Sequence, residues 1–169
     1  MAKRHHLLKW QTWGDEYWEL CVATNSYSAF LRYQPATRPA PRALRAVVVD
    51  DTPEILRTAV ELLELDGQVE VVATAKDGLE AISAVRVYDP DLVLMDVNMP
   101  RMNGLLASIR IKESDVAPKV LIMSSNDDQD TRIAAMASGA DAFLPKSDLM
   151  QHCRVQLRRL FPEHYPLLH

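Results

Sequence analysis

The sequence predicts an α/β fold in which five parallel strands form one doubly wound sheet with helices on both of its faces. Two observations lead to this prediction. After residue 43 the 169-residue chain repeats, five times, a short apolar run followed by a stretch with helical spacing. The first of these runs is apolar apart from Arg45 and does not alternate with polar residues, which is typical of a strand buried on both faces of a parallel sheet.

The first two strands and the helix between them have clear boundaries. Residues 44–49 form a β-branched apolar run that ends at a pair of aspartates. Pro53 suits the first turn of a helix, because its fixed φ angle fits there and its missing N–H would have no helical partner in any case. Apolar residues then recur at helical spacing until Gly67, and residues 69–73 form the second strand.

The middle of the chain repeats this pattern. Asp77 with Glu80 three residues later indicates the start of a helix, because both side chains can accept hydrogen bonds from free backbone N–H groups. Residues 91–96 form the third strand, which ends at Asp96, and a helix follows from Asn103.

Two further strands and two helices complete the predicted sheet. We expect a fourth strand at 120–123, a helix at 131–138 and a short fifth strand at 142–144. Ser147 can cap a last helix, which carries apolar residues at helical spacing up to Pro162.

The remaining residues lie outside this regular pattern. Three prolines mark a linker at 34–43, which precedes a predicted domain at 44–161 and a C-terminal tail at 162–169. Residues 1–33 contain all three tryptophans, and we expect a short helix or a poorly structured extension there. A partner-docking segment is the alternative, although no periodic pattern persists long enough to define a binding face.

Composition and charge exclude several classes of protein. Residues 44–169 hold thirteen Lys/Arg against twenty Asp/Glu, a balance unsuited to gripping nucleic-acid phosphates. Cys21 and Cys153 share no metal-ligand spacing, so neither zinc nor a disulfide framework is indicated. The longest uncharged stretch, residues 20–31, is too short to span a bilayer. We therefore expect a cytoplasmic protein that binds neither nucleic acid nor membrane.

Polar side chains follow four of the five predicted strands. Asp50 and Asp51 follow the first strand, Asp96 ends the third, Ser124 follows the fourth and Lys146 comes shortly after the fifth. Because the carboxyl ends of parallel strands meet at one crevice, we expect these side chains to converge. Three carboxylates there would repel one another without a cation, and hard oxygen ligands favour Mg²⁺ over zinc. A carboxylate beside Mg²⁺, a lysine and a hydroxyl is suited to accept a phosphoryl group.

The same residues carry a resemblance to a known family. Over residues 44–161 the chain resembles the receiver domain of bacterial two-component response regulators, in particular the single-domain, chemotaxis-regulator-like members. The matching set is Val-Val-Val-Asp50-Asp51, Leu-Val-Leu-Met-Asp96-Val-Asn98-Met99-Pro100, Asn103-Gly104, the Ser124 strand end and Ala-Phe143-Leu-Pro-Lys146. The resemblance implies a flavodoxin-like fold with strand order 2-1-3-4-5, an order for which a receiver protein is itself a standard example.

The resemblance also implies a magnesium site. Asp51 would bind Mg²⁺ directly, and Asp50 would bind it directly or through water. Asp96 and the main-chain carbonyl of Asn98 would complete the ligands that the protein supplies.

The resemblance also implies which residues bind the phosphoryl group and which residues change position after phosphorylation. Asp96 would be the phosphorylated residue, and Ser124 and Lys146 would contact the phosphoryl oxygens. Ser124 and Phe143 would form the switch that moves after phosphorylation. One departure stands out: most members have proline after the lysine, preceded by a cis bond, whereas Ser147 follows Lys146 here.

By this resemblance the chain is a signalling phosphoacceptor and not an enzyme, although it assists its own phosphorylation and dephosphorylation. All five histidines lie near the chain ends, so the donor would be a histidine of a partner sensor kinase or phosphotransfer protein. Only eight residues follow Phe161, and we expect a stand-alone receiver that acts on a downstream protein without a DNA-binding domain. Two alternatives stay open. One is a phosphohydrolase, for which Asn98 lacks the general acid, and the other is a scaffold that works without phosphorylation.

Overall fold

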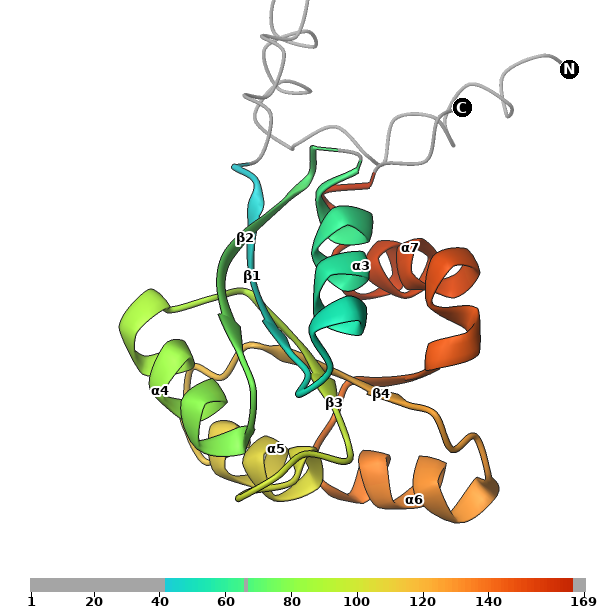
Figure 1. The fold of residues 1–169 in the computed structure, drawn as a ribbon. Helices are drawn as coiled ribbons and strands as arrows, with labels where there is room; N and C mark the ends of the chain where they lie inside the picture. Colours follow the sequence, from blue (N-terminus) through green and yellow to red (C-terminus); the bar gives the residue numbers. More distant parts are fainter. Residues whose placement is uncertain (1–41, 66, 166–169) are drawn as a thin grey trace, which may run out of the picture. The chain divides into compact units, whose positions relative to one another are not determined.

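The computed structural model describes residues 42–65 and 67–165, so the predictions for the N-terminal extension and most of the linker lie outside it. Within these residues five parallel strands form one sheet in the order β2-β1-β3-β4-β5 (Figure 1), which confirms the predicted fold and strand order. The elements in chain order are β1 (Leu44–Val49), α3 (Pro53–Glu64), β2 (Val69–Ala75), α4 (Gly78–Tyr88), β3 (Leu92–Asp96), α5 (Gly104–Lys112), β4 (Lys119–Ser124), α6 (Gln129–Ala137), β5 (Ala142–Pro145), the 3-10 helix η2 (Lys146–Asp148) and α7 (Leu149–Leu160).

The apolar strands lie at the centre of the sheet. β1 pairs with β2 on one side and with β3 on the other, and every residue of β3 is buried. β2 is an edge strand, and its burial is mixed along its length. Predominantly apolar runs thus mark the strands that are covered on both faces, as the sequence pattern predicts.

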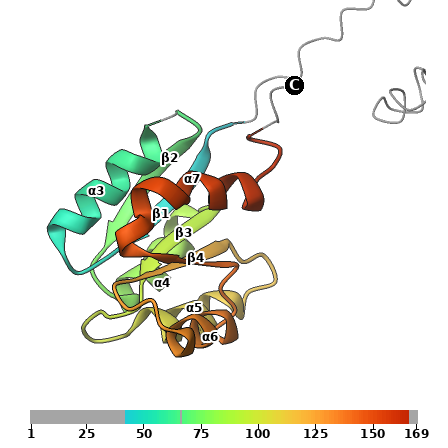
Figure 2. The same cartoon turned by 90° about the vertical axis from the view of Figure 1, so that its right-hand side faces the viewer.

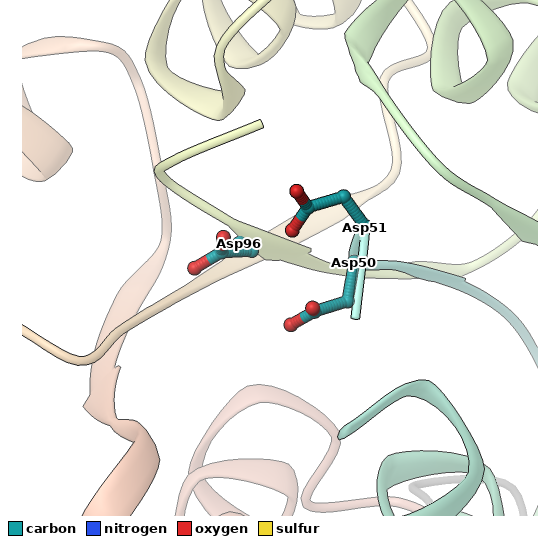
Figure 3. A group of neighbouring side chains, drawn as sticks. All are labelled: Asp50, Asp51 and Asp96. Carbon is teal, nitrogen blue, oxygen red and sulfur yellow. The ribbon is translucent and has the colours of Figure 1, made fainter. Parts of the chain in front are cut away.

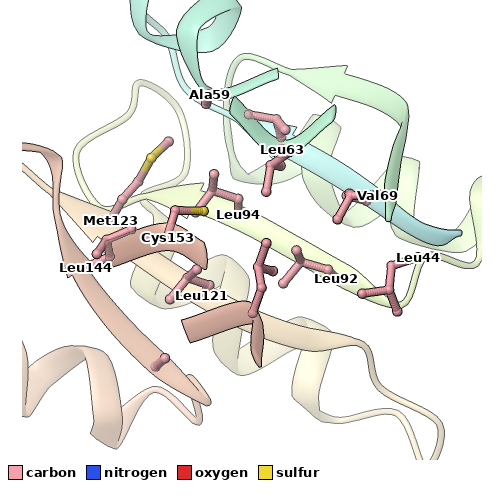
Figure 4. Packing of buried hydrophobic residues seen from close by; sticks show 14 of the residues in the cluster. Leu44, Ala59, Leu63, Val69, Leu92, Leu94, Leu121, Met123, Leu144 and Cys153 are labelled. Carbon is pink, nitrogen blue, oxygen red and sulfur yellow. The ribbon is translucent and has the colours of Figure 1, made fainter. Parts of the chain in front are cut away.

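Two hydrophobic cores lie on opposite faces of the sheet. Helices α3 and α7 cover one face, and α4, α5 and α6 cover the other (Figures 1 and 2). Side chains that alternate along each strand are divided between the two cores. The first core, part of which Figure 4 shows, contains Leu44, Leu63, Leu92, Leu94, Leu121, Met123, Leu144 and Cys153 among others. The second contains Val47, Val49, Val93, Met95, Ala107, Ile111, Val120, Ile122 and Phe143 among others.

The predicted helix starts at Pro53, Asp77 and Asn103 are confirmed, and the one at Ser147 is wrong. The Asp77 carboxylate accepts hydrogen bonds from two N–H groups at the start of α4, and Asn103 caps α5 by accepting one from Leu106 N at 2.9 Å. Ser147, in contrast, does not cap the last helix. It lies within η2, so α7 begins only at Leu149, with Asp148 at its cap position. No helix in the described part of the chain has the length and apolar character needed to cross a membrane.

The core continues beyond the last helix. Phe161 and Tyr165 are both buried and belong to the core under α3 and α7. His164 Nε2 lies 3.0 Å from the carbonyl oxygen of Arg42, where the described chain begins. Part of the segment that we expected to be a tail is therefore packed against the domain.

One ion-pair cluster ties α5 and β4 to the start of β5. Asp141 accepts hydrogen bonds from Lys112 Nζ at 2.6 Å, Lys119 Nζ at 3.0 Å and Val120 N at 2.8 Å. Burial works to raise the pKa of Asp141, but these hydrogen bonds outweigh it and lower the pKa below its ordinary value. The ionised carboxylate therefore stabilises the fold.

Asp141→Asn is expected to lower the free energy of unfolding at neutral pH by about 2 kcal/mol, because it removes charge-assisted hydrogen bonds and leaves Lys112 without its carboxylate. Since the pKa of Asp141 is lowered in the folded state, its contribution is present above the pKa of the unfolded chain, about 3.9, and is lost as the pH falls through the lower folded value. Urea unfolding at several pH values measures this. Asp115→Asn, in an exposed turn, is the control, and equal losses for both variants would contradict the prediction.

Candidate functional site

The carboxyl ends of the parallel strands bring three carboxylates together. Asp50 and Asp51 follow β1 directly, and Asp96 is the last residue of β3, the neighbouring strand. One carboxylate oxygen from each lies within 4.8 Å of the others. Figure 3 shows the three carboxyl groups turned toward the same space. The convergence that the sequence predicts is therefore present.

Lys146 lies against two of these carboxylates. Its Nζ is 2.7 Å from Asp50 Oδ2 and 3.0 Å from Asp96 Oδ1. Asp50 and Asp96 are buried, with exposed fractions of 1% and 3%, whereas Asp51 is exposed. One ammonium group thus pairs with two carboxylates of a cluster of three, and the site keeps an excess of negative charge.

The electrostatics follow from this crowding. Burial raises the pKa of the Asp96 carboxyl above its ordinary value, Lys146 opposes this without cancelling it, and the charge of Asp50 raises the pKa further. Burial alone would lower the pKa of Lys146, but hydrogen bonds to Asp50 and Asp96 raise it overall. Lys146 therefore stays protonated, and an additional cation would relieve the remaining repulsion.

The two buried carboxylates are each held by the backbone two residues ahead. Asp50 Oδ1 accepts a hydrogen bond from Thr52 N at 2.9 Å, and Asp96 Oδ2 accepts one from Asn98 N at 3.1 Å. The N–H group of Asn98 thus lies against the Asp96 carboxylate. The role of its main-chain carbonyl as a metal ligand stays a prediction.

The predicted switch residues lie on the strands next to this cluster. Ser124, at the end of β4, is fully buried, and its Oγ accepts a hydrogen bond from Asn126 N at 3.1 Å. Phe143, on β5, pairs in register with Ile122, two residues before Ser124. By strand alternation Phe143 and Ser124 lie on the same face of the sheet. Their movement after phosphorylation stays a prediction.

The chain after Lys146 differs from the geometry implied by a lysine–proline pair. All peptide bonds among the described residues are trans, including the one between Lys146 and Ser147. Lys146 begins η2 and still lies within reach of both buried carboxylates. The serine therefore does not displace the lysine from the site.

Three residues near the site carry roles that the sequence reasoning missed. A Cβ atom at Gly104 would collide with the carbonyl oxygen of Asp96, so this glycine permits a close approach. Arg101 forms ion pairs with Asp77 and Glu80 and thereby ties the segment after Asp96 to α4. The guanidinium of Arg132 lies over the ring of Phe143. The Asn103-Gly104 pair in the sequence gave some indication that Gly104 is important. Nothing in the sequence indicated the roles of Arg101 and Arg132.

Comparison with known proteins agrees with this geometry. The family model described as the response regulator receiver domain matches residues 46–154. The chain belongs to the response regulator receiver family. The fold of this receiver domain resembles that of the signal receiver domain of the response regulator NarL from Mycobacterium tuberculosis, with 30% identity, a TM-score of 0.64 and coverage of 70% of this chain and 98% of that one. The response regulator domain of CheB from Thermotoga maritima gives 26% identity, a TM-score of 0.64 and coverage of 75% and 100%.

Relatives with longer chains match over the receiver domain alone. A protein-glutamate methylesterase/protein-glutamine glutaminase of Methanospirillum hungatei JF-1 is 38% identical over 105 residues, which are 61% of this chain and 31% of that protein. This chain thus spans less than a third of that relative. The match therefore supports the receiver domain and not the activity for which the relative is named.

Proposed function

We propose that this receiver domain accepts a phosphoryl group on Asp96 in a Mg²⁺-dependent reaction, and that phosphorylation switches a surface that binds another protein. The observation that carries the proposal is the cluster of Asp50, Asp51 and Asp96 with Lys146 bonded to two of them. This cluster lies at the carboxyl edge of the sheet, where ligands bind in this class of fold.

The donor set fits magnesium. It consists of hard carboxylate oxygens without nearby imidazole or thiolate ligands among the described residues. Exposed Asp51 leaves space for the water ligands that Mg²⁺ usually retains. Asp50, Asp51, Asp96 and the main-chain carbonyl of Asn98 would hold the ion. When bound, Mg²⁺ would offset the negative charge on the transferred phosphoryl group.

The protein's own groups would carry out the transfer. An Asp96 carboxylate oxygen attacks the phosphorus of a phosphorylated histidine, so that a P–O bond forms while the P–N bond breaks and the imidazole leaves. Lys146 donates hydrogen bonds to a phosphoryl oxygen, and the Ser124 hydroxyl donates another. The Lys146 ammonium group already contacts the Asp96 carboxylate, so the lysine side chain has only to turn toward the phosphoryl group to bind it.

The signal would follow from the added charge. A phosphoryl group brings close to two negative charges to a buried position. We propose that Ser124 moves toward it and that Phe143 follows, which changes the surface formed by α6, β5 and α7. This is a local charge event that biases an equilibrium between two conformations.

The partners in this proposal are proteins. The donor is a sensor histidine kinase or a histidine phosphotransfer protein in the cytoplasm, and the target is a downstream protein. The acidic balance of residues 44–169 supports output through protein contact and not through nucleic acid.

Incubation of the protein with acetyl phosphate tests the proposal directly. With Mg²⁺ we expect one phosphoryl group per chain, and borohydride reduction followed by peptide mass spectrometry should locate it on Asp96. A chelator should prevent the labelling, because the carboxylate cluster then lacks its cation. Labelling that persists in the presence of the chelator, or that maps to another residue, would overturn the proposal.

A further inference from the structure

Arg132, on α6, connects two parts of the predicted switch. Its guanidinium carbon lies 4.9 Å from the centre of the Phe143 ring. Its Nη2 forms an ion pair with Asp127, which belongs to the segment of residues 125–128 between β4 and α6. The same guanidinium therefore contacts both the aromatic ring and the segment that follows Ser124.

This segment is braced by hydrogen bonds at both of its ends. Asn126 N donates to Ser124 Oγ, and Asn126 Nδ2 donates to Asp128 Oδ2 at 2.7 Å and to Thr131 Oγ1 at 3.2 Å. Asp128 in turn accepts from Thr131 N at 2.7 Å. Asp127 lies between Asn126 and Asp128, which carry these bonds, so we expect a movement of Ser124 to displace Asp127 as well.

The Arg132 guanidinium covers one face of the Phe143 ring. Phe143 is 9% exposed, whereas the side chain of Arg132 is 46% exposed, so the guanidinium lies on the solvent side of the ring. A cation over an aromatic face at such a site attracts the ring, and the planar guanidinium can stack there while it also binds a carboxylate.

We propose that Arg132 is a positioning residue that holds Phe143 in its unphosphorylated conformation and releases the ring when Ser124 draws Asp127 away. This inference rests on the proposed function, since it specifies what restrains the switch. Its consequence is thermodynamic. A contact made in only one of two conformations biases the equilibrium toward that conformation, and its loss strengthens the binding of any ligand that prefers the other one.

Fluorine NMR of protein labelled with fluorophenylalanine tests this inference. The chain has three phenylalanines, Phe30, Phe143 and Phe161, and Phe143→Leu identifies the signal of interest. Without ligand, Arg132→Ala should move the Phe143 signal toward the position that it takes in wild-type protein with beryllofluoride and Mg²⁺. The Phe161 signal should not move. Arg86→Ala, an exposed arginine on α4, is the matched control and should leave both signals in place.

Affinity gives a second measurement. Arg132→Ala should bind beryllofluoride with Mg²⁺ roughly 2- to 5-fold more tightly than wild type, the range that a cation–π contact at an exposed site supports. Arg132→Ala should have no such effect when Phe143 is already leucine, because the ring is then absent. Asp127→Asn should reproduce part of the gain, since without the ion pair the guanidinium is held less firmly over the Phe143 ring.

The outcomes separate this inference from the proposed function. If the wild-type protein shows no response to beryllofluoride and Mg²⁺, the proposed function fails. If the wild-type protein responds but Arg132→Ala behaves like Arg86→Ala in both measurements, the role of Arg132 alone is overturned. An equal gain in affinity in the Phe143→Leu background would also overturn it, because Arg132 would then act without the ring.

Discussion

Asp96→Asn is expected to abolish labelling by acetyl phosphate while leaving the receiver domain folded. The asparagine amide keeps the size of the side chain and can still accept from Asn98 N, but it has no carboxylate oxygen to attack phosphorus. Intact-mass spectrometry over a time course measures the loss. Asp115→Asn, the same change in an exposed turn, should label at the wild-type rate. Labelling of the Asp96 variant at that rate would place the acceptor on another residue.

The same variant gives a second result that separates chemistry from folding. Because the pKa of Asp96 is raised in the folded protein, its ionised form is disfavoured there at neutral pH relative to the unfolded chain. A neutral asparagine removes that cost. In the presence of a chelator the melting temperature of Asp96→Asn should therefore equal or exceed that of wild type. Mg²⁺ should stabilise the wild-type protein more than the variant, since a ligand stabilises the folded state more when it binds that state more tightly. A large drop in melting temperature would instead mean that Asp96 is needed for the fold.

Gly104→Ala is expected to damage both the fold and the site. The new methyl group would collide with the carbonyl oxygen of Asp96, and Gly104 N donates a hydrogen bond to the carbonyl oxygen of Val97 at 2.9 Å, which fixes the turn. The backbone of Asp96 would have to move, and overpacking of this kind costs about 3 kcal/mol. Urea unfolding and a titration with Mg²⁺ measure the two effects, and we expect both stability and metal affinity to fall.

Gly67→Ala supplies the control for this substitution. Gly67 has a φ of 69°, and a Cβ atom there would meet no neighbour within 4 Å. The cost is then conformational strain alone, about 1 kcal/mol. Mg²⁺ affinity should be unchanged in this variant, because Gly67 lies before β2 and away from the carboxylates. If both glycine variants lost Mg²⁺ affinity equally, the contact between Gly104 and Asp96 would not explain the loss.

Much of the site could be predicted because the topology leaves few choices. Once five strands run parallel, the residues after β1, β3, β4 and β5 meet at one edge, whatever the details of packing. The helix caps at Asp77 and Asn103 could also be predicted, since a cap depends on local sequence.

Contacts set by the path of the whole chain could not be predicted. The approach of Gly104 to Asp96 depends on how the segment between them turns, and the position of Arg132 over Phe143 depends on how α6 packs against β5. Ser147 shows the limit of local reasoning. Serine is a good cap, but a 3-10 turn intervened and moved the start of α7 to Leu149. The burial of Tyr165 likewise required the folded structure.

The hydrogen bonds from Thr52 N to Asp50 and from Asn98 N to Asp96 have a consequence for ligand binding. Each buried carboxylate is aimed by the backbone that directly follows it, so its rotamer is selected before any cation arrives. The entropic cost of ordering these two side chains is therefore met during folding and not during binding. Asp51 has no such restraint from burial, since it is exposed. The site thus combines two preorganised ligands with one adaptable ligand, an arrangement that favours rapid entry and release of a small, strongly hydrated ion.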